Sequence, residues 1–166
     1  MSRLGVLAMA LLLPLCAPIS VPVAQAAGAV TVQGKSGESI SIAKSKWSSA
    51  KNILVSGRGF DETTGIYLAY CVLPKAGQIP SPCGGGVNKK GIGDASHWIS
   101  SNPPPYGEGL AKPFLPGGRF AEKVLISPKI GKIDCRKVKC AITVRSDHLH
   151  EGDRTHDIFI PITFTK

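Results

Sequence analysis

Short runs of alternating apolar and polar residues, rich in β-branched side chains, recur along most of the chain. Glycine, proline, asparagine or aspartate bounds each run, a pattern typical of half-buried β-strands that end in turns. It predicts strands over Ala29–Val32, Ser39–Ile42, Asn52–Ser56, Gly65–Val72, Arg119–Ile126, Cys140–Arg145 and Asp157–Thr165. No window carries an apolar stripe at the helical period. Strands of this number and length favour an all-β fold of two packed antiparallel sheets.

Residues 74–118 interrupt this rhythm. They hold most of the proline and glycine, including Gly84–Gly86 and Pro103–Pro105, together with Trp98 and Tyr106. A loop of this length inside a compact domain is usually functional or disordered. Its aromatic residues indicate that part of it packs back onto the sandwich. We therefore expect a long insertion within one domain.

Residues 1–26 have the pattern of a secretory signal peptide. Arg3 supplies the charge, Leu4–Leu15 the apolar region, and Ala24-Gln25-Ala26 a cleavage motif that leaves Ala27 first. Three prolines break the apolar stretch, and no later apolar run is long enough to span a membrane. We expect a monomeric protein that is secreted, extracellular or envelope-associated, with residues 27–166 as its single domain.

Four cysteines follow the predicted signal: Cys71, Cys83, Cys135 and Cys140. An even number in an exported chain predicts two disulfides, because the compartment outside the membrane is oxidising. The spacings fit poorly the C-x2-C-like pairs of a zinc site. Three connectivities are possible. Pairing sequence neighbours would close two short loops, each worth about 2–3 kcal/mol of stability.

Several segments together resemble a known family. Val55–Phe60, Thr64–Tyr67 and Cys71 resemble the stretch leading to the family's first cysteine. Asp134-Cys135 with Cys140 resembles its D-C-x4-C motif, and Ile160–Phe164 resembles its last hairpin. The family is that of neocarzinostatin, the secreted actinobacterial apoproteins that carry enediyne chromophores. The resembling segments span most of residues 53–164.

The resemblance implies an immunoglobulin-like seven-stranded sandwich with disulfides Cys71–Cys83 and Cys135–Cys140. It also implies an end cleft for a small apolar or aromatic ligand, formed here by Cys71, Leu73, Cys83 and Ser146. Enediyne carriage and DNA-directed antibiotic activity are further implications. Two departures concern aromatic residues: Leu73 stands where the family has a cleft tryptophan, and Lys129–Ile133 contains none. The frame of the cleft is present without most of its aromatic contacts.

A second candidate site is the histidine cluster near the C-terminus. If residues 148–150 form a strand, His148 and His150 share one of its faces, and His156 could return across a hairpin. Imidazole and carboxylate together suit zinc, copper or iron, and a haem ligand is a variant of this hypothesis. The alternative is a polar, solvated turn built by aspartate and glycine.

The chain carries a net charge of +9, and such a surface attracts anionic polymers. The basic residues divide into Lys44 with Lys46, Lys51, Lys89 with Lys90, and a last group of Lys129, Lys132, Arg136, Lys137 and Lys139. The last group brackets a predicted disulfide loop and could bind nucleic acid or an anionic envelope polymer through counterion release. The alternative is a solvated surface that maintains solubility.

Signatures of enzymes are absent. There is no G-x-S-x-G elbow and no phosphate loop, and pairing of the mature cysteines leaves no thiol nucleophile. No cofactor is expected. The sequence therefore favours a non-catalytic secreted protein that binds a small ligand in the end cleft. A structural or adhesive envelope protein and a metal- or haem-binding accessory protein are the alternatives.

Overall fold

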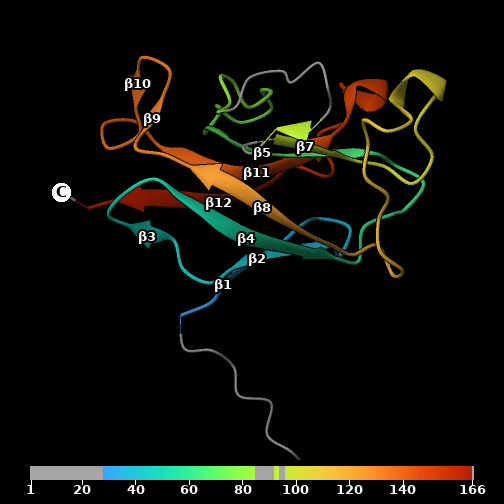
Figure 1. The fold of residues 1–166 in the computed structure, drawn as a ribbon, viewed down its shortest axis with the longest axis horizontal. Coiled ribbons are helices and arrows are strands. Elements are labelled where there is room, and N and C mark those ends of the chain that lie inside the picture. The colour runs from blue at the N-terminus through green and yellow to red at the C-terminus, as the bar shows by residue number, and fades with distance from the viewer. Residues whose placement is uncertain (1–27, 85–91, 94–95, 166) are drawn as a thin grey trace, which may run out of the picture.

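The computed structural model describes residues 28–84, 92–93 and 96–165, which form an almost purely β structure (Figure 1). The predicted signal peptide and its cleavage site lie outside the described residues, as do Lys89 and Lys90. In the described part of the chain, no helix has the length and hydrophobicity needed to cross a membrane.

Two sheets form the sandwich. The four-stranded sheet has the order β1 (Val30–Gln33), β2 (Ser39–Ile42), β4 (Lys51–Arg58), β8 (Phe120–Ile126). The six-stranded sheet has the order β3 (Lys46–Trp47), β12 (Ile158–Phe164), β11 (Cys140–Ser146), β5 (Ile66–Val72), β7 (Ser96–Ile99), β6 (Ile92–Gly93). All neighbouring strands are antiparallel except β3 and β12. A small hairpin, β9 (Lys129–Ile130) and β10 (Ile133–Asp134), and two 3-10 turns, η1 (Pro105–Gly107) and η2 (His148–His150), complete the elements.

The connections are those of an immunoglobulin-like Greek key. The chain passes from β4 to β5 and β7 in the opposite sheet, then returns to place β8 beside β4. It crosses again so that β11 pairs with β5, and β12 pairs with β11. These crossings join the two sheets through the chain itself.

All seven predicted strands are present, within one to two residues of the expected bounds. The described residues form twelve strands: these seven, four further strands of two residues each, and the four-residue β7. The prediction of one long loop over 74–118 was wrong in part, since this segment contains β6 and β7. Strand β7 pairs with β5 along the edge that β11 leaves free. The flanking glycine and proline concealed this strand in the sequence.

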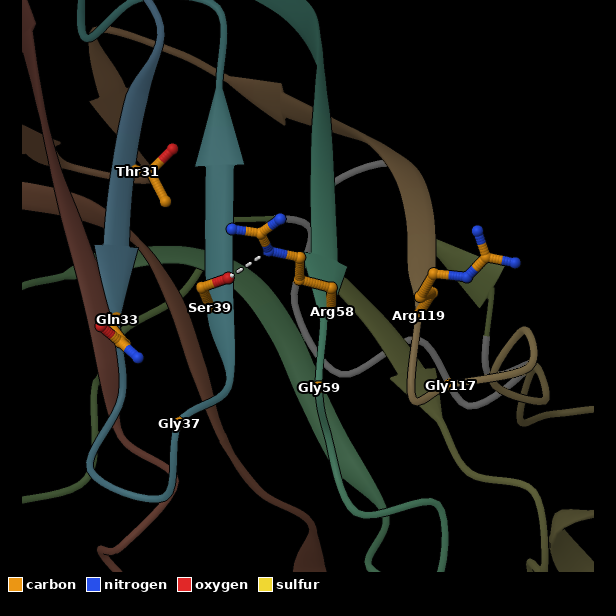
Figure 2. Close-up of a pocket in the computed structure, with 8 residues that line it drawn as sticks. All are labelled: Thr31, Gln33, Gly37, Ser39, Arg58, Gly59, Gly117 and Arg119. Atoms are coloured by element: carbon orange, nitrogen blue, oxygen red, sulfur yellow. Dashed lines mark hydrogen bonds between the residues drawn. The ribbon is translucent and has the colours of Figure 1, made fainter. Parts of the chain in front are cut away.

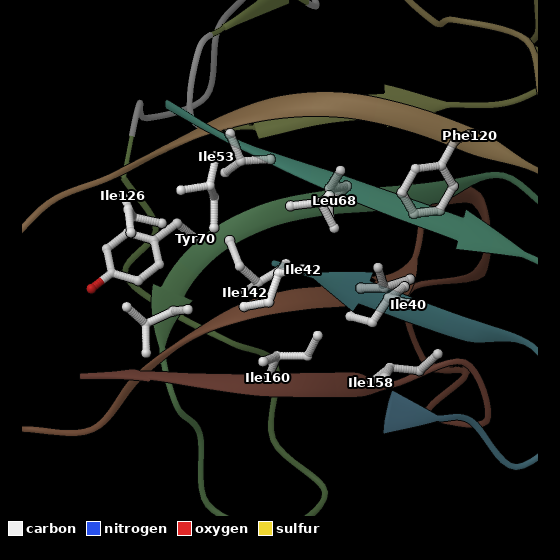
Figure 3. Close-up of a cluster of buried hydrophobic side chains, with 14 of the residues drawn as sticks. Ile40, Ile42, Ile53, Leu68, Tyr70, Phe120, Ile126, Ile142, Ile158 and Ile160 are labelled. Carbon is white, nitrogen blue, oxygen red and sulfur yellow. The ribbon is translucent and has the colours of Figure 1, made fainter. Parts of the chain in front are cut away.

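The core lies between the two sheets and follows the alternation of each strand. Leu68 of β5 and Ile142 of β11 point inward toward Ile42 and Ile53 of the other sheet (Figure 3). The same alternation turns the intervening residues of β5 and β11 outward, away from the core. The structure also contains the two neighbour-pairing disulfides, Cys71–Cys83 and Cys135–Cys140.

Two leucines provide a matched test of this core. Leu68 has 0% of its surface exposed, whereas Leu54 on the outer face of β4 has 55% exposed. We expect Leu68→Ala to lower the free energy of unfolding by about 3 kcal/mol or more, because it removes buried methyl groups and leaves a cavity. Leu54→Ala should cost less than about 1 kcal/mol. Urea denaturation of both variants measures the difference, and equal losses would contradict the described core.

Candidate functional site

A cavity of about 710 Å³ lies against the outer face of the six-stranded sheet. Its floor consists of the outward residues of two neighbouring strands, Tyr67, Ala69 and Cys71 of β5 with Thr143 and Arg145 of β11. These residues alternate with the inward core residues of the same strands. One face of β5 therefore packs in the core, and the other face lines the cavity.

The walls of the cavity come largely from residues 74–118. On one side lies the loop Ile79–Cys83, which the Cys71–Cys83 disulfide ties to the floor. On the other side lie Trp98 of β7, Tyr106 of η1 and Leu110. The volume falls within the range of sites for small molecules, about 300–1,000 Å³.

His148 connects the aromatic residues of this wall. Its Nδ1 lies 2.5 Å from the Tyr67 hydroxyl, and its Nε2 lies 2.7 Å from the Tyr106 hydroxyl. A neutral imidazole donates through one nitrogen and accepts through the other, and each hydroxyl can take the matching role. The Trp98 ring meets the His148 ring edge-on, with centroids 4.9 Å apart. These contacts hold Tyr106 beside the cavity although 61% of its surface is exposed.

Asp147 holds Trp98 and the turn that carries His148 in place. Its side chain is fully buried; Oδ2 accepts a hydrogen bond of 2.9 Å from the Trp98 indole, and Oδ1 accepts one from the Leu149 amide. The second bond begins the η2 turn that presents His148. Gly65 is required beside this carboxylate, because a Cβ there would lie 2.0 Å from Asp147 Oδ2.

Arg145 places a cation at the cavity floor. Its guanidinium lies over the Tyr67 ring, 5.0 Å from the centroid, and donates to the carbonyl of Ser146. Burial lowers the pKa of Arg145. Among the described residues, no carboxylate lies within ion-pair distance of it. The cavity therefore combines aromatic surface with a half-buried positive charge.

Of the cleft residues expected from the family resemblance, Cys71 and Cys83 line the cavity, whereas Leu73 and Ser146 are not among its lining residues. Leu73 lies just past β5, where its amide bonds to the carbonyl of Lys139. Ser146 is buried, and its hydroxyl donates to Asp153. Along β11, Ser146 lies on the same side of the strand as the core residues Ile142 and Val144. The floor residues Thr143 and Arg145 lie on the opposite side.

Sequence reasoning missed Trp98, Tyr106, Arg145 and His148 as cavity residues. Trp98 and Tyr106 lie in one stretch of the chain and Arg145 and His148 in another, and only the fold brings the two stretches together. Two features of the sequence pointed toward the cavity. One was the aromatic content of residues 74–118, and the other was the alternation along β5, which places Tyr67 and Tyr70 on opposite faces of the strand. Tyr67 faces the cavity, and Tyr70 faces the core.

The structure separates the three histidines of the candidate metal site. Residues 148–150 do not form the strand that the metal hypothesis required; the Asp147 side chain caps them as the 3-10 turn η2, in line with the alternative of a polar turn. His148 contacts the tyrosines, His150 lies 3.6 Å from Asp147, and His156 lies 3.4 Å from Glu38. The described residues contain no group of three or more histidine, cysteine, aspartate and glutamate side chains arranged to hold a metal ion.

A second hollow, of about 550 Å³, lies on the outer face of the four-stranded sheet (Figure 2). The Arg58 side chain extends toward β2, where its Nε donates to the Ser39 hydroxyl. The Arg119 side chain points away from β2. The remaining lining residues are Thr31, Gln33, Gly37, Gly59 and Gly117. This hollow offers no aromatic side chain and suits an apolar ligand less well than the first cavity.

The Asp147 contacts can be tested by substitution. We expect Asp147→Ala to lower the free energy of unfolding by about 2–3 kcal/mol, because the Trp98 indole and the Leu149 amide lose their acceptor. The exposed Glu151 provides a control, and Glu151→Ala should change stability by less than about 0.5 kcal/mol. Urea denaturation followed by tryptophan fluorescence measures both. Equal effects would show that the buried carboxylate does not support this wall.

The hydroxyl of Tyr67 predicts a dependence on pH. Burial, with the charge of Asp147 next, raises the pKa of Tyr67 to about 12. The folded protein therefore keeps this proton when the unfolded chain has lost it, so stability falls as pH rises from about 10 to about 12. Tyr67→Phe should make this fall shallower in urea denaturation across the alkaline range. An unchanged slope in the variant would contradict the assignment.

Comparisons with known proteins give limited similarity. No family model matches the chain, and no curated protein matches it. Among solved structures, the chain is similar to one titled macromomycin, at 13% sequence identity and a TM-score of 0.48. The similarity covers 78% of this chain and 100% of the macromomycin chain.

Proposed function

We propose that this protein is a secreted, non-catalytic binding protein that holds a small, flat aromatic molecule in the cavity of the six-stranded sheet. The observation that carries the proposal is the combination of Trp98, Tyr67 and Tyr106 with the cation of Arg145 around one cavity of about 710 Å³. The two disulfides and the predicted signal peptide support export.

The aromatic rings define the preferred shape of the ligand. Tyr106 and Trp98 are nearly parallel, at an interplanar angle of 27° and a centroid distance of 6.4 Å. Ile79, Pro80 and Leu110 add apolar surface across from the strands. A flat ring system buried among these side chains would gain both apolar burial and contact with ring faces.

Arg145 defines the preferred charge of the ligand. A guanidinium that is partly removed from water, with no carboxylate partner among the described residues, is suited to a carboxylate, sulfonate or phosphate group. The proposed ligand class is therefore an aromatic acid. An enediyne chromophore, which the family resemblance implies, is a larger candidate for the same cavity, and DNA-directed activity would then belong to the chromophore.

The proposal of a non-catalytic role rests on the surroundings of the hydroxyl groups. The buried Ser146 hydroxyl contacts the Asp153 carboxylate, and the hydroxyl of the floor residue Thr143 contacts the carbonyl of Ala69 and the sulfur of Cys71. His148 instead contacts the hydroxyls of Tyr67 and Tyr106, which supports a role in holding the wall.

Two fluorescent probes with the same rings test this function. 1-Anilinonaphthalene-8-sulfonate carries an acidic group, and N-phenyl-1-naphthylamine lacks it. We expect both probes to bind, with the sulfonate at least about fivefold tighter because it meets Arg145. Fluorescence titration measures each affinity, and energy transfer from tryptophan reports proximity to Trp98.

Three variants locate the probes. Arg145→Gln should remove the preference for the sulfonate, and Leu110→Trp should weaken both probes by filling the cavity. Arg58→Gln, at the second hollow, is the matched control and should leave both affinities unchanged. If Leu110→Trp binds both probes as the parent does, the cavity is not the binding site.

A further inference from the structure

The strand register gathers distant parts of the chain at one end of the sandwich. Cys140 pairs with Val72 on one side and with Ile162 on the other, and Phe164 pairs with Trp47 of β3. Lys51, which opens β4, pairs with Ile126, which closes β8. Strand β3, the β9–β10 hairpin and the C-terminus consequently lie at the same end of the molecule (Figure 1).

This end, here called the basic end, carries nine exposed cations: Lys44, Lys46, Lys51, Lys75, Lys129, Lys132, Arg136, Lys137 and Lys139. Asp134 is the one described acidic residue among them. The cations come from three separate stretches of the sequence, each unremarkable alone. Their excess over Asp134 accounts for nearly all of the net charge of +9.

The opposite end carries most of the described acidic residues. They lie in the turns before β2, between β4 and β5, around η1 and between β11 and β12: Glu38, Asp61, Glu62, Glu108, Asp147, Glu151, Asp153 and Asp157. Several are already paired, Asp157 with Arg154 and Glu38 with His156. The excess positive charge is therefore concentrated at one end.

Most cations of the basic end lack a partner of opposite charge. Arg136 is paired with Asp134, at 2.9 Å between Nε and Oδ1. Within the described part of the chain, none of the eight lysines of the basic end takes part in an ion pair. Lys44 instead lies over the ring of Trp47, 4.5 Å from the centroid. Repulsion among so many unpaired charges is relieved when a polyanion binds.

We propose that the basic end is a docking surface for a flexible, linear polymer of phosphate groups. Lysine dominates, and lysine attracts phosphate as a point charge without the fixed planar geometry of arginine. A polymer that bends can follow cations spread over β3, the β9–β10 hairpin and the Cys135–Cys140 loop. Binding is sequence-independent and releases counterions.

The same observations disfavour two other polyanions. Single-stranded nucleic acid binds best where aromatic platforms alternate with cations, and Trp47 and Phe164, the paired aromatic residues in the described part of this end, are both partly buried against the core. An anionic membrane would require apolar residues to insert beside the lysines, and among the described residues Val138 is the one large apolar side chain exposed at this end. A polyphosphate polymer needs neither feature.

Docking through this end would also orient the cavity. Tyr106 and His148 of its wall belong to η1 and η2, at the end opposite β3 and the β9–β10 hairpin (Figure 1). A protein held by its basic end would leave that wall open to solvent. This proposal does not depend on the proposed ligand, because the two surfaces share no residue.

Two variants with equal net charge test the docking surface. The basic-end variant combines Lys129→Gln, Lys132→Gln, Lys137→Gln and Lys139→Gln. The matched control combines Lys35→Gln, Arg58→Gln, Arg119→Gln and Lys123→Gln, all exposed and outside the basic end. Binding to long-chain inorganic polyphosphate is measured by fluorescence anisotropy between about 50 and 200 mM salt, a range in which counterion release dominates.

We expect the basic-end variant to lose affinity at least about tenfold, with a salt slope reduced by about three, while the control stays within about threefold of the parent. Equal losses in both variants would show that net charge alone attracts the polymer, which overturns the proposal. Tighter binding by the parent to single-stranded oligothymidylate or to phosphatidylglycerol vesicles, at equal anion concentration, would overturn the choice of polymer. Circular dichroism confirms that both variants are folded.

Discussion

The strict alternation of side chains along β5 and β11 is the constraint on which the rest of the molecule depends. Successive residues of a strand point to opposite faces, so Leu68 and Ile142 enter the core while Tyr67, Ala69, Thr143 and Arg145 face outward. A shift of one residue in the pairing would bury Arg145 between the sheets and expose the core leucine. The core therefore fixes the register, and the register fixes which side chains the cavity receives.

Much of the fold could be predicted from the sequence, because the information is local. Alternation within each run marks a strand such as Ile158–Phe164, and glycine or proline marks its ends. Strand β7 could not be found in this way, since four residues among turn formers carry too little pattern and gain their strand conformation by pairing with β5. The cavity was harder still. Trp98 is far in sequence from Arg145 and His148, and the buried Asp147 that positions Trp98 and His148 looks like an ordinary turn residue in the sequence.

The distribution of charge illustrates the same lesson on a larger scale. A net charge of +9 describes the chain but does not say where the charge lies. Proximity in the sequence grouped the cations around Cys135 and Cys140, whereas Lys46 and Lys51 each stood outside that group. The parallel pairing of β3 with the end of β12 brings these groups to one end. The topology thus concentrates the excess of basic residues at one end of the molecule and leaves most of the acidic residues at the other.

The Cys71–Cys83 bond joins a floor residue of the cavity to its outer loop. Apart from this covalent link, the loop is held to β5 by two backbone hydrogen bonds, from Val72 to Pro82 and from Gly84 to Tyr70. In the reduced chain those two hydrogen bonds alone would have to offset the conformational entropy that the loop loses when it is ordered. The shape of the cavity is consequently tied to the redox state of the surroundings, and under the proposed function a ligand would meet the complete cavity only in the oxidised protein.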